Sequence, residues 1–589
     1  MRAGRTFLVL MLLSMAGAVF AQQSNWLPRY NEESTGVTDA SLELPVSLLW
    51  KFTTENNAPS LVATPAVGED TVYVPLGDTI YAIDRHTGAL KWDQAAGDTI
   101  LSSPALVDGI LYFGSRDTNL YAVNAEDGSI EWRYRTGGNV DCPPIIVDGV
   151  CYFGSDDNRL TALDVQTRQT LWQFEAAGSI KAPPLVYRDT IILGSQGRRI
   201  YALNMDGRPI WSNAIQPRAF LASPVAERNV VMYASGRDLY ARYLDSGRMV
   251  WARPFRAGDL IVGSPSVLGR TVYVGSRDGS IYAIDTTRGR ALWRWPAEGA
   301  VDPITSSPAI VDDMIVFRAG KRDIIAISLD GREMLFKYSL PPAQERAAPT
   351  PATDIMVPGD DWIMDEMPDE APAPEMHGPG EDRRPTTARP RRAFADLIDP
   401  SVAVAENSLF VIAEDGIVYG FSSAAPDNVP PVVADAVLEV PGAARQRVQF
   451  TPELVSAGEF PERYARDIEI PGTPPIFLSM LVEDAGSGID ADSIRVTING
   501  EQVDHTFDAR EGLLWYIYDP RGAAANLPNG VKRVVVEAVD WRGNTVSKAV
   551  SFTIDNRLRP PEPPRPVRPE MPEGMHDFDE FPPDEYMRP

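Results

Sequence analysis

The feature of this chain that most limits its possible folds is an internal repeat of about forty residues. Residues 103–138 read SPALVDGILYFGSRDTNLYAVNAEDGSIEWRYRTGG, and similar stretches return at 143–178 and 264–299. The prolines that open the units are Pro65, Pro104, Pro144, Pro184, Pro224, Pro265, Pro308 and Pro400. The first six intervals between them are 39, 40, 40, 40, 41 and 43 residues. A unit this short cannot bury its apolar faces alone, so neighbouring units must stack against one another.

Each unit divides into four short β-strands. In the unit that begins at Pro104, two apolar strands, 104–107 and 110–115, are joined by Asp108-Gly109, a pair typical of tight hairpins. Two further strands cover 120–124 and 130–134. Four strands per forty-residue period are typical of a propeller blade. The eight prolines therefore predict an all-β fold with an eight-bladed β-propeller.

The eighth unit is incomplete, because after Pro400 it contains only three strand patterns, SVAVA, SLFVIA and IVYGF. A pattern typical of the fourth strand, LLWKF at 48–52, stands alone before the first unit. Pairing of 48–52 with 417–421 would close the ring and remove an open sheet edge. The propeller is therefore expected over 47–341 and 399–423, with 47–53 completing blade 8.

The units share the pattern Ala82-x-Asp84-x-x-Thr87-Gly88-x-x-x-Trp92. Its Trp position is occupied by Trp50, Trp92, Trp132, Trp172, Trp211, Trp251 and Trp293, and in blade 7 by Phe336. The pattern resembles the tryptophan-docking repeat of the PQQ-like propellers, the family of quinoprotein dehydrogenases and of BamB-type outer-membrane assembly proteins. The resemblance implies that each Trp is wedged between neighbouring blades as a structural, blade-docking residue rather than serving as a ligand platform.

From about residue 430 to 556 the pattern changes to longer alternating strands, which predict a second domain, a β-sandwich. The strand patterns are IFLSMLVED, SIRVTIN, EQVDHTF, LLWYIY, VKRVVVEAVD and TVSKAVSFTID, and Asn499-Gly500 is expected to join two of them in a hairpin. The stretches SGID at 487–490 and VDWRGN at 539–544 resemble bacterial Ig-like surface domains. Asp484, Asp490 and Asp540 could bind Ca²⁺, but solvated turn carboxylates are the commoner outcome, so no metal site is assigned.

The remaining segments are read as targeting and tether sequences. Residues 1–21 combine two arginines, an apolar run and a small-residue cleavage site, which predicts a signal peptide and export to the periplasm or cell surface. Residue 22 is Gln rather than Cys, so no lipid anchor is expected. The Pro-rich, acidic insertion 342–398 and tail 557–589 contain few large apolar residues and are expected to be disordered.

Composition argues against several classes of function. The net charge of −26 disfavours nucleic acid and anionic membranes as partners, because both bind cationic surfaces. Cys142 and Cys151 are expected to be two buried thiols. A hairpin turn at Asp148-Gly149 would place Cys151 opposite Ile146, about 13 Å along the strand from Cys142, which exceeds the reach of a disulfide. The four histidines form no metal-ligand spacing and no triad. No catalytic, cofactor-binding or metal residue is therefore assigned.

Cations recur in the loops between the second and third strands of blades 2 to 7. They are Arg116, Arg159, Arg198, Arg199, Arg237, Arg277, Lys321 and Arg322. A basic arc is unexpected on so acidic a chain, and it is the candidate partner-binding site. The alternative is local pairing with the neighbouring Asp117, Asp238, Asp278 and Asp323. The ten carboxylates of 354–382 could also mask the arc.

These features predict an exported, monomeric, non-catalytic scaffold that binds a protein of the cell envelope. The resemblance implies a BamB-like part in outer-membrane protein assembly as the nearest family function. One alternative is a cell-surface adhesin or glycan-binding module. The other is a PQQ-dependent quinoprotein dehydrogenase, against which stands the absence of that family's adjacent cysteine pair, since Cys142 and Cys151 are nine residues apart.

Overall fold

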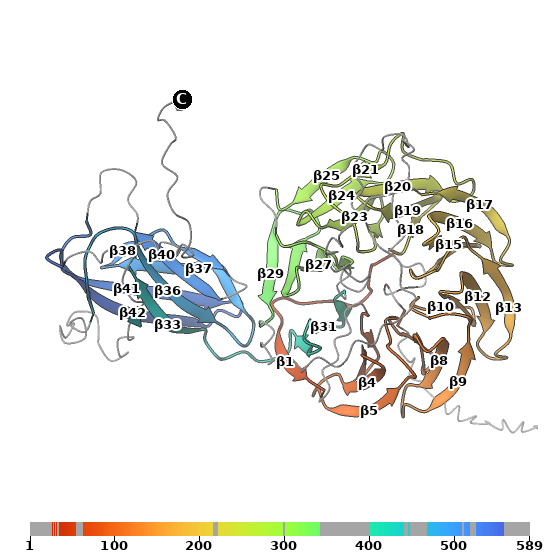
Figure 1. Ribbon diagram of the computed structural model, residues 1–589, viewed down its shortest axis with the longest axis horizontal. Helices are drawn as coiled ribbons and strands as arrows, with labels where there is room; N and C mark the ends of the chain where they lie inside the picture. The colour runs from red at the N-terminus through yellow and green to blue at the C-terminus, as the bar shows by residue number, and fades with distance from the viewer. Residues whose placement is uncertain are drawn as a thin grey trace, which may run out of the picture.

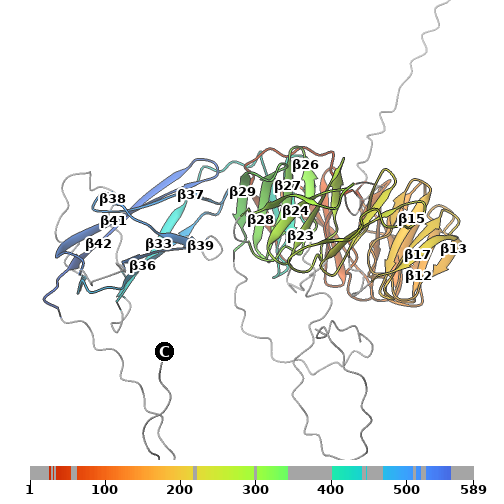
Figure 2. The same ribbon diagram turned by 90° about the horizontal axis from the view of Figure 1, so that it is seen from above.

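The computed structural model describes residues 26–27, 29, 31, 35–54, 63–215, 222–297, 301–341, 401–440, 446–447, 468–508, 512–518 and 526–558. Every helix or strand assigned among them is a β-strand (Figures 1 and 2). The expected signal peptide, the insertion and nearly all of the tail lie outside these residues. No helix long and apolar enough to cross a bilayer occurs in the described part of the chain.

Eight four-stranded antiparallel sheets form the ring in Figure 1. Blades 1 to 4 contain β2 (Ala66–Val67), β3 (Thr71–Leu76), β4 (Thr79–Asp84), β5 (Leu90–Ala95); β6 (Ala105–Val107), β7 (Ile110–Gly114), β8 (Asn119–Asn124), β9 (Ile130–Arg135); β10 (Ile145–Val147), β11 (Val150–Gly154), β12 (Arg159–Asp164), β13 (Thr170–Glu175); and β14 (Leu185–Tyr187), β15 (Thr190–Ser195), β16 (Arg199–Asn204), β17 (Pro209–Ala214). Blades 5 to 7 contain β18 (Val225–Glu227), β19 (Val230–Ser235), β20 (Asp238–Tyr243), β21 (Phe255–Arg256); β22 (Ser266–Leu268), β23 (Thr271–Ser276), β24 (Ser280–Asp285), β25 (Ala291–Trp295); and β26 (Ala309–Val311), β27 (Met314–Ala319), β28 (Asp323–Ser328), β29 (Met334–Ser339). Blade 8 contains β30 (Ala403–Ala405), β31 (Ser408–Ile412), β32 (Val418–Ser422) and β1 (Ser47–Phe52). The predicted all-β, eight-bladed propeller is confirmed.

The core of the ring lies between the blades. In blade 2, the second and third strands are almost wholly buried, whereas the outermost strand β9 alternates between exposed and half-buried residues. Apolar side chains of adjacent blades share clusters, as Phe113 does with Tyr73 of blade 1. The inner hairpin of blade 2 turns at Asp108 and Gly109, both with the positive φ that a two-residue type I′ turn needs.

Blade 8 is completed by a strand from the opposite end of the chain. Strand β1 pairs antiparallel with β32, with Leu48 opposite Phe421 and Lys51 opposite Tyr419. A bulge between Leu48 and Trp50 interrupts the register. The pairing satisfies the backbone groups of what would otherwise be an exposed sheet edge.

Ahead of β1, the chain crosses the axis of the ring. Trp26 exchanges two backbone hydrogen bonds of 2.7 Å with Leu106 on the inner strand of blade 2. The carbonyl of Thr35 accepts from Val267 of blade 6 at 2.9 Å, and Thr38 donates to Ile310 of blade 7 at 3.0 Å. Blades 2 and 6 face each other in a ring of eight, so the described residues of this N-terminal segment lie in the central channel (Figure 1).

The C-terminal domain consists of two five-stranded sheets. One sheet has the order β34 (Gln446–Arg447), β33 (Val432–Glu439), β36 (Ile476–Glu483), β40 (Leu513–Tyr518), β39 (Thr506–Asp508), and the other β35 (Glu469–Ile470), β42 (Thr545–Ile554), β41 (Gly530–Asp540), β37 (Ile489–Ile498), β38 (Glu501–Gln502). Both sheets contribute to one core, for example Leu478 and Val482 from the first and Val534 and Phe552 from the second. We call this domain the sandwich.

One strand prediction for the sandwich is wrong. The pattern EQVDHTF at 501–507 was expected to be a single strand, but β38 pairs with β37 in one sheet and β39 pairs with β40 in the other. The chain crosses between the sheets here, and Val503 packs against the core at the crossing. The predicted hairpin at Asn499-Gly500 is present, with φ of 51° and 88° and Ile498 opposite Glu501.

The sandwich contacts the propeller where the ring closes. The Trp541 ring lies 5.9 Å from the Phe336 ring of blade 7, and its indole N–H donates to the carbonyl of Lys337 at 2.9 Å. The amide of Leu48 in β1 donates to the carbonyl of Gly486 at 3.0 Å. In Figure 1 the sandwich accordingly lies beside β1 and β29.

Two N-terminal deletions separate the role of β1 from that of the channel segment. Deleting 22–40 removes the channel contacts but keeps β1, whereas deleting 22–53 removes both. We expect the longer deletion to lower the melting temperature much further and to cause self-association through the exposed edge of blade 8. Thermal unfolding and size-exclusion chromatography would measure this. If the 22–53 deletion is monomeric and has the same melting temperature as the 22–40 deletion, β1 is not needed to close the ring.

Candidate functional site

The tryptophans of the repeat lie between blades. The Trp92 indole N–H donates to the carbonyl of Ala125 at 3.1 Å, at the start of the turn between the third and fourth strands of the next blade. The same bond to the next blade joins Trp50 to Arg85, Trp172 to Met205, Trp211 to Leu244 and Trp251 to Thr286. Trp293 packs against Gly331, and Trp132 packs in a cluster with Val165. Their contacts are those of a blade-docking residue.

A glycine in the turn of the next blade makes room for six of the seven indoles; the exception is Trp132, where Arg168 holds this position, also with positive φ. A Cβ on Gly128 would lie 2.7 Å from Trp92, and Gly88, Gly207, Gly247, Gly289 and Gly331 meet the preceding tryptophan in the same way. These glycines also have positive φ. The Gly of the shared motif is therefore explained by close approach as well as by backbone conformation.

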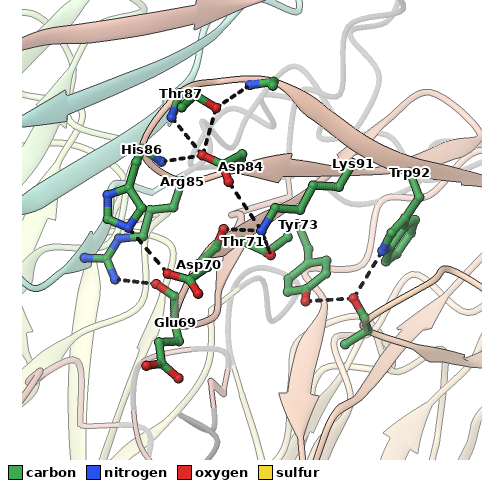
Figure 3. A network of polar contacts seen from close by, with 12 residues as sticks. Glu69, Asp70, Thr71, Tyr73, Asp84, Arg85, His86, Thr87, Lys91 and Trp92 are labelled. Carbon is green, nitrogen blue, oxygen red and sulfur yellow. Dashed lines mark hydrogen bonds and ion pairs between the residues drawn. The ribbon is translucent and has the colours of Figure 1, made fainter.

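The Asp and Thr of the motif shape the same turn. In blade 1 the Asp84 carboxylate accepts from the Thr87 amide at 2.9 Å and the Thr87 hydroxyl at 2.8 Å, and lies 3.5 Å from Lys91 (Figure 3). Slight burial opposes ionisation, but these hydrogen bonds and Lys91 hold the pKa of Asp84 below its ordinary value. Arg85 in this turn donates to the carbonyl of Glu406 in blade 8 at 2.8 Å, so the turn ties the last blade to the first. The motif is structural.

The cations of the predicted arc are in different environments. Arg116 pairs with Asp141 at 3.2 Å, Arg237 with Asp259 at 3.7 Å, and Lys321 with Glu414. Arg199 donates to the Ser212 hydroxyl and Arg322 to the Leu340 carbonyl, while Arg277 is half-buried. Arg159, Arg198 and Arg237 are exposed on the neighbouring blades 3, 4 and 5. Partner binding by these residues stays a prediction.

Local pairing occurs, but not with the neighbours named from the sequence. Asp117 and Asp278 accept from the hydroxyls of Tyr121 and Tyr282, at 2.5 and 2.6 Å. Asp238 pairs with Arg256 at 2.8 Å, and Asp323 with Lys337 at 2.9 Å. Each of these carboxylates bonds within its own sheet or to the preceding blade, so the predicted pairing of adjacent residues is wrong. The segment 354–382 lies outside the described residues.

A buried charge network on the same rim was not predicted. Lys181 lies 2.9 Å from Asp141 and 3.2 Å from Asp156, and Asp141 also pairs with Arg116. The side chains of Asp141 and Lys181 are only 5% and 9% exposed. Burial alone would lower the pKa of Lys181, but Asp141 and Asp156 raise it above its ordinary value, so the ammonium stays charged.

The sequence did contain a signal for this network. Asp141 and Lys181 stand three residues before Pro144 and Pro184, where the corresponding residues of blades 2, 5 and 6 are Leu101, Leu221 and Val262. A charge in a repeat position that is otherwise uncharged and mostly apolar indicates either a specific pair or a ligand. Here it is a pair that joins blades 2, 3 and 4.

A second unpredicted grouping lies at the start of the sandwich. One carboxylate oxygen from each of Asp427, Asp484 and Asp540 lies within 4.8 Å of the others. Burial, with Asp427 and Asp540 nearby, raises the pKa of Asp484 to about 6 against the hydrogen bonds from Gly488 and Gly486. Two of the three aspartates considered for Ca²⁺ are therefore together, Asp490 is not among them, and Asp427 was missed.

The thiols offer no reactive group. Cys142 and Cys151 are both unpaired and buried. Burial raises the pKa of Cys142 to about 12 and raises that of Cys151 further, so both stay protonated at neutral pH. This agrees with the expectation of two buried thiols.

The ring, the docked tryptophans and the turn glycines define an eight-bladed β-propeller of the tryptophan-docking class. The model of the family described as outer membrane protein assembly factor BamB matches residues 47–140, 102–259 and 237–366. These matches overlap and together cover more than half of the chain, which therefore belongs to this family. They do not extend over the sandwich, whose likeness to bacterial Ig-like domains stays a prediction. No curated protein matches the chain.

Solved structures with similarity to the chain include designed and natural proteins. The computationally designed Ika8 protein has a TM-score of 0.47 at 14% identity, covering 62% of this chain and 96% of its own. BamB from Moraxella catarrhalis has a TM-score of 0.45 at 15% identity, covering 66% of this chain and 100% of its own. A europium-containing methanol dehydrogenase has a TM-score of 0.45 at 13% identity, covering 54% of this chain and 85% of its own. All three TM-scores are below 0.5.

The glycine contacts can be tested with a matched pair of substitutions. Gly128 and Gly149 have φ of 77° and 74°, but a Cβ on Gly149 would meet nothing within 4 Å. Gly149→Ala should cost about 1–2 kcal/mol from backbone strain alone. Gly128→Ala should cost clearly more, because it must also displace the Trp92 indole. Equal losses in denaturant unfolding would show that the tryptophan does not depend on the glycine.

Proposed function

We propose that this protein is a non-catalytic, exported scaffold of the cell envelope that binds another protein through the rim carrying the basic arc. Membership of the BamB family supports a place in the envelope. The observation that carries the proposal is the N-terminal segment in the channel, where Trp26, Thr35 and Thr38 bond to inner strands of opposite blades. Because the chain itself bonds to the inner strands that line the channel, we take the rims and outer strands as the surfaces for partners.

The exposed part of the arc narrows the partner surface. Arg159, Arg198 and Arg237 lie on three successive blades, and among the described residues only Arg237 of the three has an acidic neighbour, Asp259 at 3.7 Å. Exposed guanidinium groups can form two parallel hydrogen bonds to a carboxylate, which favours an acidic segment of a partner protein. The buried network of Asp141 and Lys181 stiffens the same rim between blades 2 and 4. The proposed partner surface is therefore the rim of blades 3 to 5.

Charge reversal on the two rims tests this proposal. The variant Arg159→Glu/Arg198→Glu/Arg237→Glu changes the proposed surface. A matched control, Arg188→Glu/Arg228→Glu/Arg270→Glu, makes the same charge change at exposed inner-hairpin turns on the opposite rim of blades 4, 5 and 6. We expect crosslinking in the envelope fraction to capture one discrete protein with the wild type and the control, and to lose it with the first variant.

Two outcomes would contradict the proposal. If both triple variants capture the partner equally, the partner binds at a surface other than this rim. Retention of the wild type on envelope glycans, without any crosslinked protein, would instead favour the adhesin or glycan-binding alternative.

A further inference from the structure

The three clustered aspartates come from separate segments that meet at the junction of the two domains. Asp427 lies in the connector between β32 of blade 8 and β33 of the sandwich, Asp484 follows β36, and Asp540 ends β41. The loop after Asp484 touches the propeller, because the Gly486 carbonyl accepts from Leu48. The loop after Asp540 also does so, through Trp541 on Phe336. Anything bound by the three carboxylates would therefore hold both contact loops.

The spacing of the carboxylates suits a calcium ion. Calcium takes six to eight oxygen ligands at about 2.3–2.6 Å, so two oxygens on one ion lie at most about 5 Å apart. The three carboxylate oxygens lie within 4.8 Å of one another. The group contains no nitrogen or sulfur ligand, which favours a hard cation over zinc.

Two buried oxygens at this place have no partner among the described residues. Oδ2 of Asp484 accepts from Gly486 and Gly488, at 3.0 and 2.6 Å, but Oδ1 is buried and unsatisfied. Ser487 is fully buried, and its hydroxyl oxygen is unsatisfied as well. The Ser487 amide donates to Asp427 at 2.7 Å, and covalent geometry keeps the hydroxyl next to that amide. Buried oxygens without partners require an explanation, and a bound cation satisfies both.

The charges at the junction also lack a counter-ion among the described residues. None of the three aspartates forms an ion pair with a described lysine or arginine. The neighbouring Arg542 donates instead to the Ser47 hydroxyl and to the carbonyls of Ser423 and Ala425. Three like charges this close repel one another unless a cation or a proton intervenes.

We infer that Asp427, Asp484 and Asp540, with the Ser487 hydroxyl, form a Ca²⁺ site that fixes the sandwich to the closing blade of the propeller. Backbone carbonyls or water would complete the coordination. The ion holds the Asp484 loop against β1 and the Asp540 loop against blade 7. It thereby couples the orientation of the sandwich to closure of the ring.

The test uses the full-length chain freed of metal with a chelator and then titrated with Ca²⁺. Asp484→Asn removes one charge while its amide oxygen can still accept from Gly486 and Gly488. The matched control is Asp490→Asn, in the same domain but outside the cluster, where Asp490 accepts from the Asp492 amide. Tb³⁺ luminescence excited through tryptophan gives a second readout, because Trp541 directly follows Asp540.

Calcium at about a hundred times its dissociation constant should raise the melting temperature by roughly 3–8 °C in the wild type and in Asp490→Asn. Mg²⁺ at the same ionic strength should give a much smaller shift. Asp484→Asn should lose the calcium shift and the sensitised Tb³⁺ signal, yet melt without metal at or above the wild type, because repulsion is relieved. That last result separates loss of the site from misfolding.

Three results would overturn the inference. The first is the absence of any shift in the wild type up to about 10 mM Ca²⁺, above the range of weak extracellular sites. The second is an equal shift with Mg²⁺, which would indicate general screening. The third is an unchanged calcium response in Asp484→Asn, which would place binding elsewhere, for instance in the acidic insertion.

Discussion

Strand pairing between β1 and β32 is the interaction on which the rest of this molecule depends. A propeller blade is a four-stranded sheet with an inner and an outer edge strand. In seven of the blades here, all four strands follow one another in the sequence. Blade 8 obtains that strand from the other end of the chain, about 370 residues away in sequence. The entropic cost of closing so long a loop rises only slowly with its length. An open sheet edge, by contrast, would promote self-association. The channel segment leads into this strand, and the sandwich contacts it through the hydrogen bond from Leu48 to Gly486.

The sandwich replaces a part that blade 8 lacks. In the other blades the turn from the third to the fourth strand covers the outer tryptophan of the preceding blade. Blade 8 has no such turn, since the chain leaves after β32. In its place Trp541 covers Phe336, and a Cβ on Gly488 would lie 3.0 Å from Tyr338 of the same strand. An added domain therefore fills the gap that circular closure creates.

The repeat allowed much of this fold to be predicted from sequence. Spacing of prolines and tryptophans depends on local strand and turn preferences, so blades, hairpins and the pairing of 48–52 with 417–421 could be predicted. The channel segment could not be predicted, because its isolated β-bridges at Trp26 and Val37 form only against the inner strands of blades that are far apart in the sequence. Strand β33 was not predicted, and 501–507 was predicted as one strand instead of two. In both cases tertiary packing decides whether a segment pairs as a strand and with which sheet.

The candidate sites follow the same rule. The basic arc was found because it recurs in each repeat, but the carboxylates that neutralise part of it, such as Asp141, come from the next blade. Asp427 was missed because it lies in a connector, and it gains meaning only beside Asp484 and Asp540. Residues that recur in every repeat have structural roles. Side chains from distant segments meet where the repeat is broken, as at Lys181 and at the interrupted blade 8.

The central claim is that β1 is an integral strand of the ring rather than a loosely attached end. Hydrogen exchange of the full-length protein, resolved by peptide, tests it most directly. The amides of β1 should exchange as slowly as those of β32 and of outer strands such as β9, because they open only when the ring does. Fast exchange of β1 beside a protected β32 would contradict the account, since the ring would then be held closed without it.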